Sequence, residues 1–156
     1  MLQSFKAGFK FEEKMAGTYH LLSRPEEERA FSFTAQASVE NVLDYLRDMA
    51  ATLQGTLEME GFADRVPLDG SLEINPLFGR VLRYQFSFAG NDGQRYRFAG
   101  QKDVQLLDLP GSMTTLPGAV YDESGAEIAR VLTRFDLGSD LVPFLLSWRP
   151  LLPFIG

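Results

Sequence analysis

The chain has 156 residues and a mass of 17.5 kDa, which is the size of a single domain with a core large enough to fold without cross-links. It contains no cysteine, which excludes disulfides and thiolate metal sites, and only one histidine, which excludes any site that needs two imidazoles. Its net charge of −6 does not suggest a nucleic-acid partner. No stretch approaches the ~20 apolar residues of a membrane-spanning helix and the first residues do not resemble a signal peptide, so we expect a cytoplasmic protein with no membrane span.

Alternating apolar and polar residues open the chain. From Phe9 to Leu21 every second side chain is apolar apart from Glu13, which predicts a strand with one face in a core. Residues 24–29 form a charged turn. A second predicted strand follows, with Phe31, Phe33, Ala35 and Ala37 on one side.

A helix is predicted next, beginning at Ser38, which is a good N-cap, with Glu40 favouring its first turn. Its apolar face recurs at helical spacing and comprises Val39, Val42, Leu43, Leu46 and Met49–Ala50. We therefore expect one α-helix between the second and third strands.

Strand-like alternation returns after Gly55 and continues to Phe135. The predicted strands centre on Leu57–Met59 and cover Val66–Ile74, Val81–Phe88, Tyr96–Gly100, Thr114–Tyr121 and Glu127–Phe135. Residues 90–93 and 122–125 predict hairpin turns, because Asn, Asp and Gly tolerate positive φ. Pro117 indicates a sheet edge or a bulge.

About eight antiparallel strands with one apolar face can close into a barrel, which removes the exposed sheet edges. Such a barrel is either filled by its own side chains or holds one small ligand. The inward positions are rich in aromatics, but small residues also face inward, namely Gly17, Ala35, Ala37, Gly100 and Ala129. Both interpretations remain open from the sequence.

The segment 141–155 is apolar throughout and is interrupted by three prolines. We interpret residues 141–156 as a tail of the single domain 1–156 that packs across the outside or the mouth of the barrel. A homodimer interface and a docking strip for a partner protein are the alternatives.

No phosphate-binding glycine loop, nucleotide fingerprint or serine elbow is present. His20 lies on the polar face of the first strand, where a solvated side chain is the simplest interpretation. Asp64, Asp69 and Glu73 cluster around a predicted turn, but their spacing matches no known cation-binding loop. We therefore expect no metal, no cofactor and no catalytic residue.

Glu13 stands apart because it lies on the apolar face of its strand, between Phe11 and Met15. An unpaired carboxylate there would be costly. Glu13 either pairs with a buried Arg or Lys, or anchors the polar end of a ligand in an apolar pocket. Lys102 is the cation that we most expect near it, together with the pair Thr114–Thr115.

Several segments resemble, in the same order, a module that accompanies flavin-dependent cholesterol-oxidase-like (GMC) oxidoreductases and related hydrolases. Residues 11–17 resemble its F-x-E-x-M-x-G opening. Later segments resemble its G-T-V, M-x-Y-x-L-x-F, L-x-G-F-K-x-V and T-T-L motifs, at residues 55–57, 82–88, 98–104 and 114–116. The similarity covers roughly residues 9–135.

The chain departs from this family at two points. Ser112 or Met113 stands where the family has an aspartate, and residues 70–75 differ from its G-x-F-N-L-F motif. No flavin-binding fingerprint is present, so oxidoreductase activity is not implied. The resemblance implies an accessory module of sterol or lipid metabolism and emphasises Glu13, Tyr84, Lys102 and Thr114–Thr115.

We therefore predict an all-β, eight-stranded antiparallel barrel, lipocalin-like or calycin-like, with one helix. The predicted function is non-catalytic binding of a hydrophobic small molecule, fatty-acyl or sterol-like, in the barrel interior. The predicted ligand-binding residues are Glu13, Phe33, Tyr84, Phe86, Phe98, Lys102, Thr114 and Thr115.

Two other hypotheses are kept. In the first, the chain is an interaction module that docks on a lipid- or sterol-metabolising enzyme or forms a homodimer through residues 141–155. In the second, Glu13 is the general base of an enzyme, with a pKa raised by burial. We rank the enzyme last, because no substrate suggests itself.

Overall fold

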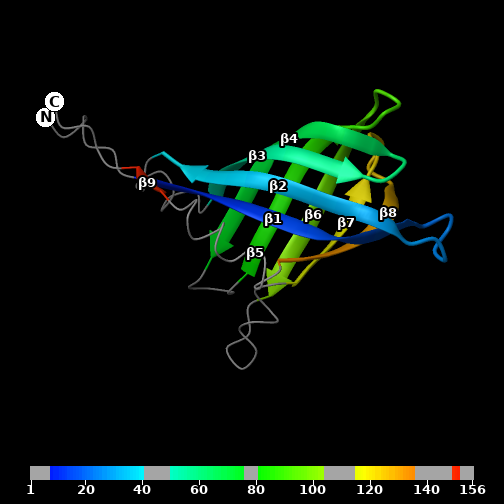
Figure 1. The fold of residues 1–156 in the computed structure, drawn as a ribbon, viewed down its shortest axis with the longest axis horizontal. Coiled ribbons are helices and arrows are strands. Elements are labelled where there is room, and N and C mark those ends of the chain that lie inside the picture. Colours follow the sequence, from blue (N-terminus) through cyan, green and yellow to red (C-terminus); the bar gives the residue numbers. More distant parts are fainter. Residues whose placement is uncertain (1–7, 41–49, 76–80, 104–114, 136–148, 152–156) are drawn as a thin grey trace, which may run out of the picture.

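The computed structural model describes residues 8–40, 50–75, 81–103, 115–135 and 149–151. They form one antiparallel sheet whose strands are β1 (Gly8–Leu21), β2 (Arg29–Val39), β3 (Ala50–Met59), β4 (Ala63–Asn75), β5 (Val81–Ala89), β6 (Arg95–Asp103), β7 (Thr115–Tyr121), β8 (Glu127–Arg134) and β9 (Arg149–Leu151). The strands follow one another around the sheet in chain order (Figure 1).

Strand β1 closes the sheet into a barrel because it pairs with both β2 and β8. It pairs with β2 from Phe9↔Val39 to Tyr19↔Arg29, and with β8 from Ala16↔Arg134 to Leu21↔Ala129. The predicted eight-stranded antiparallel barrel is confirmed, and closure gives each of these eight strands a paired neighbour on both sides.

The predicted helix is wrong at both of its ends. Ser38 and Val39 are the last residues of β2, and Ala50 is the first residue of β3. Val39 is buried while Ser38 is not, so the two-residue alternation of β2 continues where the prediction began a helix. No helix occurs among the described residues, and residues 41–49 of the prediction lie outside them.

Four hairpin turns lie at one end of the barrel, on the right in Figure 1. The two predicted turns at 90–93 and 122–125 are confirmed, with positive φ at Gly93 and Gly125. In the second turn the Asp122 carboxylate accepts hydrogen bonds from the backbone N–H groups of Ser124 and Ala126. The Ser124 hydroxyl also donates a hydrogen bond to this carboxylate. That bond is the main cause that lowers the pKa of Asp122, and the backbone hydrogen bonds act in the same direction.

Two glycines let neighbouring strands bend close together. A Cβ atom on Gly17 would lie 2.8 Å from the Cα of Thr133, and one on Gly55 would lie 2.8 Å from the Cα of Ala35. Any larger residue would push the adjacent backbone away. These inward glycines therefore serve the curvature of the wall rather than leaving space for a ligand.

Pro117 was predicted to mark an edge or a bulge, and it lies where one ladder stops. The pairs between β6 and β7 run from Arg97↔Tyr121 to Gly100↔Gly118, and the described ladder ends there. Pro117 still pairs with Leu132 of β8. Because proline has no backbone N–H to donate, it suits a position at which β7 is paired on one side.

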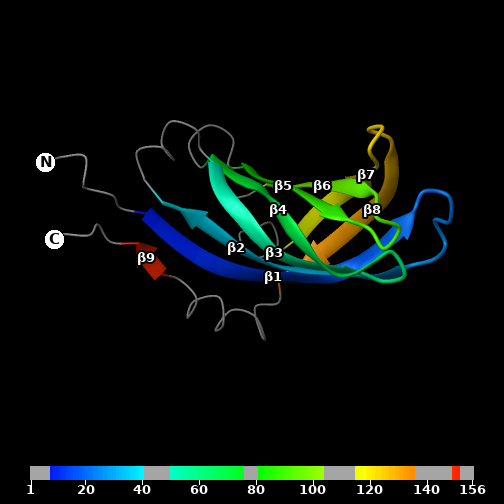
Figure 2. The ribbon, with the colours of Figure 1, turned by 90° about the horizontal axis from the view of Figure 1, so that it is seen from above.

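Part of the apolar tail joins the barrel. Strand β9 pairs with the beginning of β1, from Gly8↔Leu151 to Lys10↔Arg149, beside the long first strand in Figure 2. The rest of the predicted tail lies outside the described residues. The described residues contain no helix that is long and apolar enough to cross a membrane.

Candidate functional site

Glu13 points into the barrel from β1. Its neighbours on the inward face are Phe11 and Met15, and all three side chains are buried, with Glu13 only 9% exposed. Across the ladder Glu13 pairs with Ala35 of β2. The strand period fixes this direction, because moving Glu13 outward would also expose both apolar neighbours.

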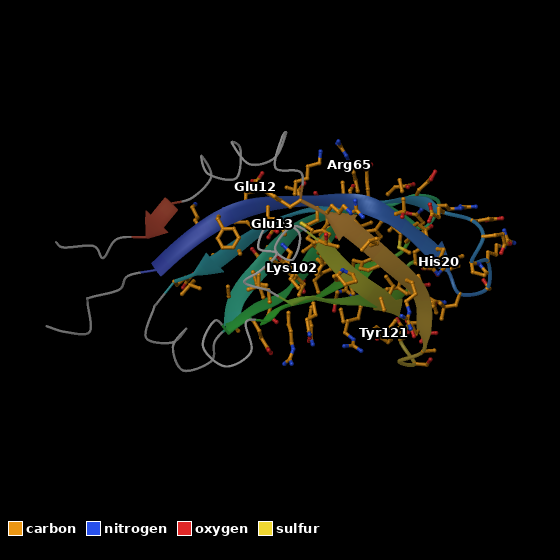
Figure 3. All side chains as sticks on the ribbon, turned by 90° about the horizontal axis from the view of Figure 1, so that it is seen from below. Glu12, Glu13, His20, Arg65, Lys102 and Tyr121 are labelled. Carbon is orange, nitrogen blue, oxygen red and sulfur yellow. The ribbon has the colours of Figure 1, made fainter. Side chains whose placement is uncertain are left out.

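Its partners come from the opposite wall of the barrel. Lys102 Nζ donates a hydrogen bond of 2.7 Å to Glu13 Oε1, and the Tyr84 hydroxyl donates one of 2.8 Å to Oε2. Tyr84 and Lys102 are on the adjacent strands β5 and β6, which lie four and three strands around the barrel from β1. These three residues, which we call the polar cluster, bridge the interior, and Figure 3 shows Glu13 and Lys102 pointing toward each other.

The polar cluster is buried and internally satisfied. Lys102 is 3% exposed and Tyr84 is 2% exposed. The Lys102 ammonium also lies 5.2 Å from the centroid of the Tyr84 ring, a cation–π distance. Among the described residues, every buried side-chain nitrogen or oxygen has a hydrogen-bond partner. Both carboxylate oxygens are therefore already engaged by protein donors.

Burial dominates the titration of Tyr84. Removal from water raises the pKa of its hydroxyl well above 10, and the negative charge of Glu13 and the hydrogen bond to it act in the same direction. Tyr84 therefore remains a neutral donor at neutral pH. This makes it suited to positioning a carboxylate, not to accepting a proton.

An aromatic layer lies next to the polar cluster, on the side of the hairpin turns. Phe33 lies 5.2 Å from Phe86 and 5.9 Å from Phe98, and the Phe86 and Phe98 rings stack at 4.7 Å. Phe33 also meets the Tyr84 ring edge-on at 6.3 Å. The predicted apolar residues are thus brought together with the cluster, but they pack on one another.

Of the two predicted threonines, the described one, Thr115, does not join this group. Thr115 is adjacent to the fully buried Leu116 in β7, and it is partly exposed and pairs with Arg134 on the outer face. Thr114 lies outside the described residues. Within the part of β7 that is described, strand alternation turns the Thr115 side chain away from Glu13.

The other candidate residues lie on the outside. His20 pairs with Arg130 across the β1–β8 ladder and lies near the hairpin end in Figure 3. Asp64 is tied to Asn91, whose side-chain amide lies 3.4 Å from its carboxylate. No group of three or more His, Cys, Asp or Glu side chains among the described residues is placed to hold a metal.

Sequence reasoning missed a groove on the outer wall. Its volume is about 480 Å³ and its floor carries small residues of β6 and β7, whereas long polar side chains form its rim. The rim includes Arg83, Gln85, Gln101, Glu127 and Arg130. The sequence signal that could have revealed it is the outward polar residues of β5 and β8, namely Arg83 and Gln85 on β5 and Glu127 and Arg130 on β8.

Comparisons with known proteins return no match for this chain: no family model, no curated protein and no solved structure is similar to it. The resemblance to the oxidoreductase-associated module therefore rests on the short motifs alone. The closed barrel, the polar cluster and the outer groove are the observations from which a function is inferred.

Proposed function

We propose that this lipocalin-like barrel binds a hydrophobic small molecule, fatty-acyl or sterol-like, without transforming it. The observation that carries the proposal is the polar cluster, because the other buried side chains of the described residues are apolar apart from Thr133. A Lys–Glu pair there costs desolvation that apolar residues of similar volume would avoid. A few convergent polar groups in an apolar cavity are typical of ligand sites, and eight-stranded barrels suit one small ligand.

The ligand would lie at the end of the barrel opposite the hairpin turns. The stacked Phe86 and Phe98 rings, with Phe33 packed against them, fill the other direction. Two of the segments that connect strands at the proposed end, 40–49 and 104–114, are longer in sequence than the turns at 90–94 and 122–126. The apolar body of the ligand would contact inward residues such as Leu53 and Leu72. Each Å² of apolar surface buried in this way would contribute about 25 cal/mol to the free energy of binding.

Native mass spectrometry of the purified protein, followed by solvent extraction of the same sample, tests this proposal. We expect a retained lipid or sterol at close to one molecule per chain, and the spectrum also gives the oligomeric state. A clean apo mass after incubation with mixed lipids would contradict the proposal.

A matched pair of variants locates the ligand. Ala37 is buried and faces inward, and its neighbour Gln36 is exposed on the outer face of β2. We expect Ala37→Phe to fill the proposed space and lower the bound fraction, and Gln36→Phe to leave it unchanged. Circular dichroism checks that both variants fold. Equal loss in both would place the ligand elsewhere.

The outer groove favours a second candidate function, docking on an acidic segment of a partner protein such as a lipid-metabolising enzyme. Five exposed arginines lie on β5, β6 and β8, although the chain as a whole carries −6: Arg83, Arg95, Arg97, Arg130 and Arg134. Arg83 also contacts Gln101 at 3.2 Å, and such side-chain amides can bond a peptide backbone. Arginine forks suit carboxylates.

Fluorescence anisotropy with a labelled Glu-rich dodecapeptide tests docking. We expect binding that weakens with salt and is lost in Arg83→Gln/Arg130→Gln. Arg24→Gln/Arg65→Gln removes the same charge from exposed positions on other elements and should leave binding unchanged. If both double variants weaken peptide binding equally, net charge alone explains the binding, and docking at the outer groove is contradicted.

A further inference from the structure

The charges inside the barrel are balanced before any ligand is present. Among the described residues, the buried polar or charged side chains are Glu13, Lys102 and Thr133, so one carboxylate faces one ammonium. The two charged groups form an ion pair of 2.7 Å, and the Tyr84 hydroxyl adds a neutral donor. The described part of the interior therefore offers no surplus positive charge to an incoming anion.

We infer that the barrel selects an uncharged lipid alcohol, such as a sterol or a long-chain alcohol, over a free fatty acid. This inference rests on the proposed function and narrows it. A fatty-acid carboxylate at the polar cluster would lie beside the Glu13 carboxylate in a region of low dielectric, where like charges repel strongly. To take Lys102 for itself, it would have to leave Glu13 buried and unpaired.

A hydroxyl group fits the remaining hydrogen-bonding capacity of the cluster. Among the described residues, each Glu13 oxygen accepts one hydrogen bond, from Tyr84 or from Lys102, and a carboxylate oxygen offers two lone-pair directions. The Lys102 ammonium has three N–H donors, of which one is directed at Glu13. A ligand hydroxyl can donate to the carboxylate and accept from the ammonium together, without bringing a charge.

The experiment compares two fluorescent probes that differ in one group, cis-parinaryl alcohol and cis-parinaric acid, at pH 7. We expect the wild-type protein to bind the alcohol at least about tenfold more tightly, the equivalent of ~1.4 kcal/mol. The uncharged methyl ester of the same acid should recover most of that difference, and it tests the role of ligand charge without any substitution in the protein.

Variants then test whether Glu13 sets the preference. Glu13→Gln keeps the shape and leaves Lys102 uncompensated, so we expect the preference to reverse toward the acid. Glu12→Gln is the matched control, because Glu12 is the neighbouring residue on the exposed face of β1 (Figure 3). Circular dichroism establishes that both variants fold.

The outcomes separate this inference from the proposed function. If the acid binds wild-type protein as tightly as the alcohol, lipid binding stands and the selection for an uncharged group is overturned. If ester and acid bind equally weakly while the alcohol binds, the hydroxyl and not the charge determines selection, and the charge argument is overturned. If none of the three probes binds, both the proposed function and this inference are wrong.

Discussion

The aromatic layer and the polar cluster occupy neighbouring levels of the barrel interior but differ in the side chains that fill them. Toward the hairpin turns, the rings of Phe31, Phe33, Phe86 and Phe98 pack on one another, stacked or edge-on, across the interior. One level further, Glu13 and Lys102 bridge the interior between opposite walls. Both levels are buried, so the difference lies in chemistry and not in exposure.

This contrast separates the source of stability from the source of selectivity. Aromatic rings gain free energy from every apolar contact, and several arrangements of similar volume would serve. An ion pair gains little net free energy after desolvation, but it penalises any partner of the wrong charge. The aromatic layer should therefore dominate folding, and the polar cluster should dominate discrimination.

The largest effect is expected from Phe98→Ala. The Phe98 ring contacts three other rings of the aromatic layer and is fully buried, so its removal leaves a cavity. We expect a loss of about 3–5 kcal/mol in the free energy of unfolding, measured in urea. Leu132→Ala, at a 42% exposed position on β8, is the control and should change stability by under about 0.5 kcal/mol. Similar values for both would mean that the ring layer does not carry the core.

The next effect is expected from Lys102→Met, which leaves Glu13 buried without its cation. We expect a loss of about 3 kcal/mol, because the Tyr84 hydrogen bond remains and offsets part of the cost. Urea unfolding at pH 7 measures it.

The double variant Glu13→Leu/Lys102→Met sharpens that comparison. It replaces both charges with apolar groups, and we expect it to recover stability to within about 1 kcal/mol of wild type. At the same time it should lose the preference between alcohol and acid probes. A double variant that is as unstable as Lys102→Met alone would show that the polar cluster contributes to stability in its own right.

The smallest effect is expected from Tyr84→Phe, which removes one buried hydrogen bond at a cost of about 1–2 kcal/mol. Because the folded protein raises the pKa of Tyr84 above its unfolded value of 10, this group favours folding fully below pH 10 and loses that contribution as pH rises further. Wild type should therefore lose more stability between pH 9 and pH 11 than Tyr84→Phe does.

Tyr121→Phe, which removes a hydroxyl from the outer face, is the control for the alkaline experiment. It measures how far the removal of a tyrosine hydroxyl outside the polar cluster changes the slope of stability against pH. If Tyr84→Phe keeps the wild-type slope, the burial of Tyr84 does not couple its titration to folding.

Most strands could be predicted from the sequence because their inward faces repeat with period two. The error at Ser38–Ala50 has a specific cause, since Val39 belongs to two patterns at once. It continues the row Phe31 to Ala37 in β2, and it also begins an apolar spacing typical of a helix. The β-branched side chain of Val39 favours the strand. Because the predicted helix extended to Ala50, the third strand was also predicted to begin later than it does.

The site was predictable in its members and not in its contacts. Glu13 is visible as a charge in an apolar row, Lys102 is the cation expected near it, and Tyr84 is among the predicted ligand-binding residues but is not predicted to contact Glu13. That they meet depends on β5 and β6 lying opposite β1, which follows from closure and not from any local pattern. Thr115 failed to join for a local reason, because alternation along β7 places Leu116 and not Thr115 inside.

The double pairing of β1 constrains the order in which the protein can be completed. Its second partner, β8, ends at Arg134, so a chain emerging from the ribosome cannot close the barrel until that strand is available. Until then the backbone groups of β1 that face β8 are unpaired and can pair with another chain. Contacts between such distant parts of a sequence also form slowly. The interval before β8 arrives is thus when a nascent chain is most exposed to aggregation, and when a chaperone would help most.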